Sequence, residues 1–320
     1  MFIRQLEYLI ALEKYRHFAK AAESCFVSQP SLSVAIRQLE DELGLTIIQR
    51  QRRFLGFTPE GQRVLEWARK TLSSLDGLKQ EAAFAQSVAG GHMTLGTVPS
   101  ALRAVSRLAA EFRRAIPGLT LEIVSLSTRE IQRRLVHQEL HLGLAYSGEM
   151  EESLVSQPLY AERFVLVCGR KSSLLPRTTL SWQALAALPL CLLDSEMQNR
   201  RIIDEVFQQA GIVPNVVLET NNISLLYEMV QEGDLYSIMP ISAIPAYLLN
   251  NSEMMIMPVT PFSTPQLNLL RLRQDNSPAV LEAVWQISQR LNIAQQFDEE
   301  AAAERYSLQL SGDINNELEG

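Results

Sequence analysis

The chain has 320 residues, 47% of them hydrophobic and 20% charged, which is the composition of a globular protein with two or three domains. This composition excludes a wholly disordered chain, a collagen-like fibre and a small disulfide scaffold, and no run of eighteen apolar residues is present that could cross a membrane. The formal net charge of −7 is unevenly distributed, because residues 1–70 hold eleven Lys/Arg against eight Asp/Glu and the remainder holds eighteen against twenty-eight. A basic end on an acidic chain favours binding of a polyanion by the N-terminal segment.

The first sixty residues show the pattern of short helices joined by a turn. Apolar residues recur at helical spacing over 6–12, and an alanine-rich stretch follows over 18–25. Ser28 is suited to be the N-cap of the next helix, Pro30 fits its first turn, and Gly44 supplies a left-handed end. The spacing predicts a helix-turn-helix.

Two short strands and a long helix are expected next. Residues 46–50 and 54–58 read as strands on either side of a basic tip, which has the form of a wing. Thr58 and Pro59 then start a helix that is predicted to reach about residue 88. Its apolar and small residues step by three or four in a coiled-coil-like seam, made by Leu65, Ala68, Leu72, Leu75, Leu78 and Ala82. A long helix with one apolar stripe predicts dimerisation; packing of the stripe on the chain's own body is the alternative.

Beyond a Gly90-Gly91 hinge, strand and helix patterns alternate, so the overall fold class is α/β. Strands are expected at 93–98, 119–125, 142–146, 164–168, 190–193, 216–219, 236–239 and 267–272. Ligands in such folds gather at the carboxyl ends of strands, beside helix N-termini. The acidic tail, 295–320, is expected to be a frayed helix or disordered.

Several stretches together resemble the LysR-type transcriptional regulators. They are 18–22, 27–33, 36–44 and 58–61 in the N-terminal part, and 112–121, 140–146, 230–234 and 239–240 further on. The resemblance covers about residues 1–293. It implies a winged helix-turn-helix DNA-binding domain (1–58), a dimerisation helix (59–89) and an effector-binding domain (90–294), followed by the tail. Within the effector domain it implies subdomain I (90–161 and 265–294) and subdomain II (162–264), as in periplasmic binding proteins.

For DNA binding, the exposed N-terminal end of the recognition helix is expected to face the major groove. By similarity with the family, the contacts to bases and phosphates come from Ser28, Gln29, Pro30, Ser31, Ser33 and Arg37, and from Arg50, Arg52 and Arg53 on the wing. The wing arginines could instead be solvated surface charges. Val34 departs from the family, whose members often carry Arg there, so either base readout is weaker or Arg37 and the wing compensate.

For effector binding, the resemblance implies a cavity between the two subdomains. The residues that match family positions are Ser100, Thr128, Tyr146, Ser195, Gln198, Asn199, Arg200 and Asn222. Helix N-termini, hydroxyls and arginines favour a carboxylate or another small anion. Arg201, next to Arg200, would add a further donor. The alternative is that Ser100 and Thr128 only cap helices and that Arg200 and Arg201 are surface charges. His141 stands where the family usually has Asp, as an ordinary histidine or a pH sensor.

Other functions are weighed on the same residues. The four histidines have no metal-ligand spacing and no catalytic or nucleotide-binding motif occurs, so neither an enzyme nor a cofactor is expected. Thiol redox sensing is a rival, although Cys168 and Cys191 lie in apolar strands and Met197 occupies the stretch where a sensor cysteine is expected. A solute-binding protein would need a secretory signal, and none is visible. The sequence predicts a cytoplasmic regulator, a dimer of dimers on two-fold symmetric DNA, with RNA polymerase as a further partner.

Overall fold

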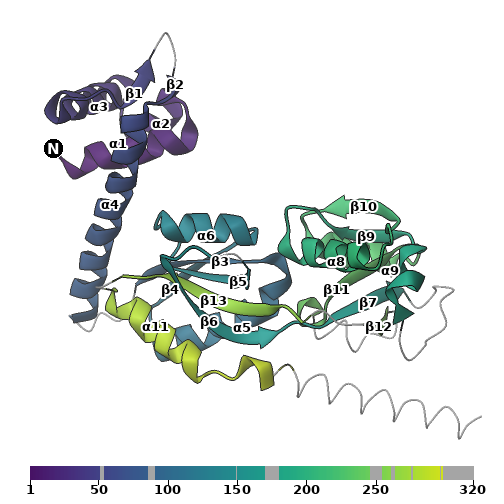
Figure 1. Ribbon diagram of the computed structural model, residues 1–320. Helices are drawn as coiled ribbons and strands as arrows, with labels where there is room; N and C mark the ends of the chain where they lie inside the picture. The colour runs from purple at the N-terminus through teal and green to yellow at the C-terminus, as the bar shows by residue number, and fades with distance from the viewer. Residues whose placement is uncertain are drawn as a thin grey trace, which may run out of the picture.

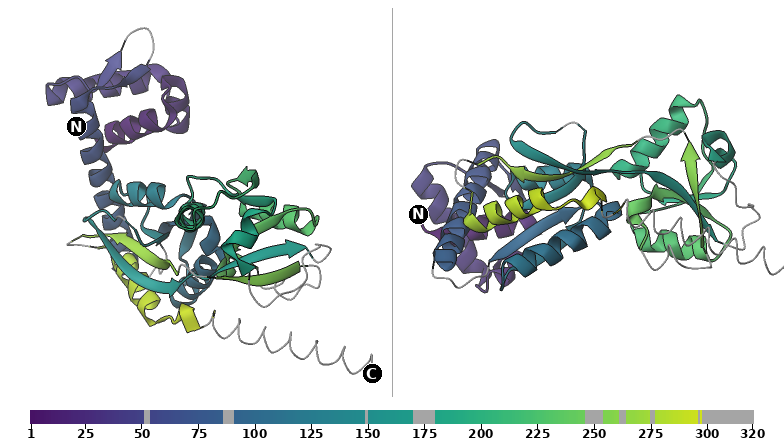
Figure 2. Two further views of the ribbon diagram at one scale, coloured as in Figure 1. Left: turned by 45° about the vertical axis from the view of Figure 1, so that its right-hand side comes forward. Right: turned by 90° about the horizontal axis from the view of Figure 1, so that it is seen from below.

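The computed structural model describes residues 1–50, 54–85, 91–148, 150–169, 180–245, 254–260, 264–274, 277–295 and 297. A helical N-terminal domain stands at one end of a long helix, and an α/β body lies at the other end (Figure 1). The left view of Figure 2 shows the same separation, whereas in the right view, from below, the N-terminal domain and the body overlap. Among the described helices, none combines the length and the apolar composition that a membrane crossing requires.

The N-terminal domain contains three helices and a two-stranded wing. The elements are α1 (Ile3–Tyr15), α2 (Phe18–Ser24), α3 (Gln29–Leu43), β1 (Ile48–Arg50), β2 (Phe54–Phe57) and the long α4 (Pro59–Ala85). Ser28 caps α3 by accepting the Ser31 N–H at 3.2 Å, and Gly44 ends it with φ 66°. Thr58 accepts the Gly61 N–H at 2.9 Å at the start of α4. The local signals therefore predicted both helices, and the expected helix-turn-helix and wing are confirmed.

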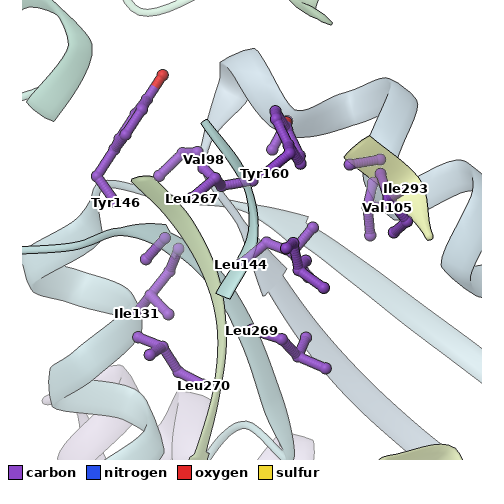
Figure 3. Packing of buried hydrophobic residues seen from close by; sticks show 14 of the residues in the cluster. Val98, Val105, Ile131, Leu144, Tyr146, Tyr160, Leu267, Leu269, Leu270 and Ile293 are labelled. Atoms are coloured by element: carbon purple, nitrogen blue, oxygen red, sulfur yellow. The ribbon is translucent and has the colours of Figure 1, made fainter. Parts of the chain in front are cut away.

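The first sheet of the body has five strands in the order β4-β3-β5-β13-β6. They are β3 (His92–Thr97), β4 (Thr120–Ser125), β5 (Leu142–Tyr146), β6 (Leu154–Ala161) and β13 (Gln266–Leu272), with the helices η1 (Pro99–Ala101), α5 (Leu102–Ala115), α6 (Thr128–Val136) and α11 (Ala279–Arg290). A Cβ at Gly143 would lie 2.3 Å from Cγ2 of Ile131, so glycine lets α6 approach β5 closely. Aliphatic side chains from both sides of β5 and β13 fill this core (Figure 3).

The second sheet has six strands in the order β10-β9-β11-β7-β12-β8. They are β7 (Phe164–Gly169), β8 (Leu180–Ser181), β9 (Leu190–Leu193), β10 (Val216–Thr220), β11 (Tyr236–Pro240) and β12 (Met254–Thr260), with α7 (Trp182–Ala186), α8 (Gln198–Gln209), α9 (Ile223–Gln231) and η2 (Ile241–Ala243). The chain enters this sheet after β6 and returns before β13. The two crossing segments pair where the Glu162 N–H donates to the Pro265 carbonyl at 2.9 Å.

All eight expected strands are present, and three strands were missed. Two of the missed strands, β6 and β8, lie at sheet edges, and β8 has only two residues. Pro158 interrupts the strand pattern of β6, and an edge strand tolerates a residue without an N–H donor. The third, β12, carries Pro258 in a methionine-rich run of weak alternation.

Helix α4 also packs against the body. The Glu81 carboxylate accepts the Ala279 N–H at the start of α11 at 3.0 Å. A Cβ at Gly77 would lie 3.4 Å from Cγ of Pro278. One face of the C-terminal half of α4 is therefore covered within the same chain.

Candidate DNA-binding surface and effector cavity

The start of α3 is an exposed polar surface. Ser28, Gln29, Pro30 and Ser31 are exposed, and Ser33 is half-buried. Arg37 is exposed further along α3, as is Val34, whose exposed fraction is 51%. The N–H groups of the first turn and their positive dipole end suit phosphate, while short polar side chains suit base edges.

The basic tip of the wing is only partly described. Arg50 is the last residue of β1, but its side chain, Arg52 and Arg53 lie outside the described residues. Their predicted contacts with DNA stay predictions.

The predicted dimer seam on α4 divides into two parts. Leu65 and Ala68 are buried, and Leu72 packs on them, within the core of the N-terminal domain. Leu75 is half-buried, whereas Leu78 and Ala82 are exposed. Trp67, which the sequence analysis did not single out, is 68% exposed and lies eleven residues before Leu78, on the same helix face. The part of the seam that a second chain could cover therefore runs from Leu75 to Ala82, in the C-terminal half of α4.

A cavity of about 1480 Å³ lies between the two subdomains. Its walls are the loop and helix at 125–137, the segment at 146–152 after β5, and the start of α8 at 196–205. Helices α6 and α8 face each other on this side of the body (Figure 1). Of the eight predicted effector residues, Thr128, Tyr146 and Gln198 line the cavity.

Thr128 lines the cavity as the first residue of α6. The cap of α6 is Ser127, which accepts the Glu130 N–H at 3.4 Å. Thr128 is 9% exposed, and its Oγ1 has no hydrogen-bond partner among the described residues. A buried hydroxyl without a partner is costly, so Thr128 is suited to bind a ligand.

Ser100 lies behind the cavity wall. Its Oγ is 2.8 Å from the Tyr146 hydroxyl, and both side chains are buried. Tyr146 points its hydroxyl away from the aliphatic core (Figure 3). Burial, with a smaller effect of nearby Glu162, raises the pKa of Tyr146 well above its usual value, so the hydroxyl stays protonated. Ser100 therefore orients Tyr146 and does not line the cavity.

The other four predicted effector residues do not line the cavity. Arg200 is held by its own subdomain: Nε is 2.8 Å from Asp204 Oδ1, and Nη1 is 2.6 Å from Glu219 Oε1. Asn222 caps α9, where its Oδ1 accepts the Ser224 N–H at 2.9 Å. Asn222 is therefore a helix cap, and Arg200 is buried in ion pairs of its own subdomain, so it is not the surface charge that the alternative expected. Ser195 is exposed and Asn199 is buried, and neither belongs to the cavity lining, although their neighbours Glu196 and Gln198 do.

Charged residues make up a large part of the lining, and of these only Arg201 was indicated by the sequence. Five carboxylates, Glu130, Glu151, Glu152, Glu196 and Glu205, accompany three arginines, Arg129, Arg133 and Arg201. The Arg133 guanidinium donates to Glu130 at 2.8 Å and lowers the pKa of that carboxyl to about 2. The lining therefore has more negative than positive groups, which does not support an anion as the sole ligand. The spacing of Thr128, Arg129 and Arg133 puts them on neighbouring turns of α6. This spacing is the sequence signal that indicates charged residues beside Thr128.

His141 fills the position of the family's aspartate as a hydrogen-bond acceptor. Its Nδ1 accepts the Thr94 N–H at 3.0 Å, which requires an unprotonated Nδ1. Burial lowers the pKa of His141 below its usual value, against an opposing effect of Asp76. Its neutral ring therefore replaces a carboxylate in joining β3 to the turn before β5.

The cysteines are not arranged as a redox pair. Cys168 and Cys191 are buried, on β7 and β9, which are separated by β11. Two strand spacings correspond to about 9–10 Å, and a disulfide needs Cα atoms within about 7 Å. The two thiols also belong to different cores on opposite faces of the sheet. Burial raises the pKa of Cys191 to about 11, which disfavours the reactive thiolate.

Acidic, histidine and cysteine side chains form no cluster of metal-binding geometry within the part of the chain that the structure describes. The candidate sites are therefore a polar surface for DNA and a cavity for a small organic molecule.

Comparisons with known proteins identify the family. Residues 3–62 match the model of the bacterial regulatory helix-turn-helix proteins of the lysR family, and residues 86–292 match that of the LysR substrate binding domain. A hydrogen peroxide-inducible genes activator of Dickeya chrysanthemi is 29% identical over 246 residues, 77% of this chain and 81% of that protein. The transcriptional regulator AlsR of Bacillus subtilis is 27% identical over 249 residues, 76% of this chain and 82% of that protein.

Solved structures share the fold of the whole chain. A full-length OxyR variant from Pseudomonas aeruginosa has a TM-score of 0.69 at 23% identity, covering 92% of this chain and 97% of that one. Full-length CbnR in complex with its target DNA has a TM-score of 0.63 at 20% identity, covering 91% and 99%. The chain belongs to the LysR family of DNA-binding transcriptional regulators, which are not enzymes.

Proposed function

We propose that this regulator reads a specific, two-fold symmetric DNA site and is switched by a small molecule in the cavity between its subdomains. The observation that carries the effector part is the buried Thr128 hydroxyl, which lines the cavity and has no partner among the described residues. The domain bounds inferred from the sequence, 1–58, 59–89 and 90–294, are part of this proposal.

The DNA-binding surface is the start of α3 together with the wing. Gln29, Pro30, Ser31 and Ser33 take the positions facing bases and phosphates, and Ser28 holds the first turn. Arg37 and the wing residues Arg50, Arg52 and Arg53 contribute phosphate contacts and salt-dependent affinity. Exposure of the α3 N-terminus supports this assignment.

The effector carries a cationic group as well as the anionic group inferred from the sequence. The N-terminus of α6, Thr128 and Arg201 suit a carboxylate. Glu151, Glu152 and Glu196 on the opposing walls suit an amine. A zwitterion such as an amino acid, or a related molecule, satisfies both sets.

The working oligomer is a dimer of dimers. The exposed face of α4, with Trp67, Leu75, Leu78 and Ala82, supplies the pairing surface. Closure of the cavity changes the angle of α4, and this movement changes DNA bending and contact with RNA polymerase. The effector must bind one of the two arrangements more tightly for such a switch to operate.

Thiol sensing is the second candidate, because several relatives are named hydrogen peroxide-inducible genes activators. The separation of Cys168 from Cys191 and their burial count against it. Peroxide treatment followed by thiol counting should leave all three thiols free. A reversible disulfide would replace the effector proposal with redox sensing.

The test of effector binding is a thermal-shift screen with carboxylates, amino acids and polyamines. Thr128→Val should abolish the shift of the best ligand and leave DNA affinity unchanged, because the substitution removes one hydroxyl at constant volume. Thr120→Val, on an exposed strand position outside the cavity lining, is the matched control. Ligand binding that survives in Thr128→Val would remove Thr128 from the site, and loss of DNA affinity would make it structural.

A further inference from the structure

Among the described side chains of the N-terminal domain, Phe26 is the most exposed large apolar one. Its exposed fraction is 95%, in the turn between α2 and α3. An isolated exposed apolar residue needs no explanation by itself. The backbone conformation of Phe26, however, does require an explanation.

Phe26 occupies the left-handed position of a Schellman motif. The Val27 N–H donates to the Ala22 carbonyl at 3.0 Å, and the Phe26 N–H donates to the Glu23 carbonyl at 3.1 Å. Its φ is 57°, a conformation that glycine adopts freely and that strains other residues. A phenylalanine here therefore gains nothing from packing and is disfavoured by the backbone.

The same motif ends α6 and provides an internal comparison. The Glu139 N–H donates to the Arg134 carbonyl at 2.8 Å, and the Gln138 N–H donates to the Leu135 carbonyl at 3.0 Å. Gln138 has φ 60°. That site carries a flexible polar side chain, as a structural turn allows, whereas Phe26 presents a rigid ring to the outside.

The surface next to Phe26 is the DNA-reading surface. Only Val27 separates Phe26 from Ser28, where the exposed run 28–31 at the start of the recognition helix begins. The exposed Val34 adds a second apolar group on α3. Phe26 thus extends the surface that the family presents to DNA, and strain stored beside a functional surface points to a role there.

We propose that the Phe26 ring contacts DNA beside the recognition helix and reads the C5-methyl group of thymine. A phenyl ring cannot hydrogen-bond to base edges, and the thymine methyl is the apolar feature of the major groove. Arginine, common at the position of Val34 in the family, suits guanine instead. This inference rests on the proposed placement of α3 in the groove and adds a preference for thymine at one position.

The first test compares Phe26→Gly with Phe26→Ala in the full-length protein on its selected DNA site. Both variants lose the ring, and both should bind about tenfold more weakly, a loss equivalent to about 1.4 kcal/mol. Only Phe26→Gly removes the backbone strain of the positive φ, so the Tm of this variant should exceed that of Phe26→Ala by roughly 2–6 °C. A structural role predicts instead that DNA affinity follows Tm. Gln138→Gly is the matched control, with a raised Tm and unchanged DNA affinity.

The second test replaces each thymine of the site by uracil, which removes only the methyl group. At one position of the site, this replacement should weaken binding of the unaltered protein by about fourfold. The same replacement should have no effect on Phe26→Gly, because the ring that reads the methyl is gone. Equal losses for both proteins at every position would overturn the assignment.

Gln29→Ala separates this inference from the function on which it rests. Loss of affinity in Gln29→Ala with none in Phe26→Gly would overturn the Phe26 contact alone. No loss in either variant would overturn the placement of α3. A changed oligomeric mass of Phe26→Gly with unchanged DNA affinity would assign the ring to a protein interface and overturn the DNA contact.

Discussion

Among single residues, Glu162 shows how burial sets the protonation of one carboxyl group. It lies on the segment that crosses from the first sheet to the second and is 1% exposed. Ser242 donates a hydrogen bond to its Oε2. Burial, and to a smaller extent the nearby Glu162, raises the pKa values of the Tyr160 and Tyr146 phenols. Burial raises the pKa of Glu162 to about 8. The carboxyl is therefore protonated at neutral pH in the folded chain.

This protonation makes stability depend on pH. Because the pKa in the folded state lies above the ordinary glutamate value of 4.5, the folded state holds an extra proton between about pH 4.5 and 8. The free energy of unfolding should fall as pH rises through this window, by on the order of 4 kcal/mol. Urea unfolding at pH 5 and pH 8.5 should show this loss in the unaltered protein and much less of it in Glu162→Gln. Parallel pH profiles would contradict the assignment, and Glu232→Gln, at an exposed position, is the control.

Among the elements, α4 combines two packing surfaces on one helix. Its first turns complete the core of the N-terminal domain through Leu65 and Ala68. Its middle turns expose Trp67 and Leu78 on one face, and Lys70 Nζ lies 5.0 Å from the Trp67 ring centroid. The exposed face is the proposed dimer surface.

A charge on that face should separate the dimer. Leu78→Glu places a carboxylate where two apolar faces meet, and the dimer dissociation constant should rise at least about tenfold. Lys79→Glu is the matched control, because it lies about 100° around the helix. Sedimentation equilibrium measures both. An unchanged mass of Leu78→Glu would exclude this face from the interface.

The elements also show which information is local in the sequence. Ser28, Gly44 and Thr58 act through their own backbone neighbours, so α3 and α4 were predictable from short stretches. Arg200 could not be assigned in this way, because its partner Glu219 comes from β10 and only the folded sheet brings them together. The acidic walls of the cavity come from three distant segments and were missed for the same reason. Likewise, Leu65 and Leu78 belong to the same apolar stripe in the sequence, but only the folded structure shows that Leu65 is buried and Leu78 is exposed.

In the whole molecule, Arg69 connects the N-terminal domain to the cavity. Its guanidinium pairs with Glu13 of α1 and lies 4.0 Å from the Glu139 carboxylate. Glu139 is also 3.5 Å from Arg133, which lines the cavity. Charged contacts therefore run continuously from the cavity wall through α4 to the DNA-binding domain.

Removing Arg69 should uncouple effector and DNA binding. Coupling between such sites is typically 5–150-fold in affinity, and the same factor applies in both directions. In Arg69→Gln, the factor by which DNA changes effector affinity should approach one. Effector affinity without DNA should be unchanged, because Arg69 does not line the cavity. Arg69→Lys should retain part of the coupling. Titrations of effector with and without DNA measure the factor, and full coupling in Arg69→Gln would exclude this route.

The most direct test of sequence-specific DNA binding by α3 and the wing is selection of bound duplexes from a random DNA pool by the full-length protein at physiological salt. Sequence reading by paired α3 helices predicts enrichment of a two-fold symmetric site whose half-sites are spaced by whole helical turns of about 10 base pairs. Binding without enrichment would contradict sequence reading by α3. No binding at any protein concentration, with or without the ligands found by thermal shift, would contradict the assignment of α3 and the wing to DNA.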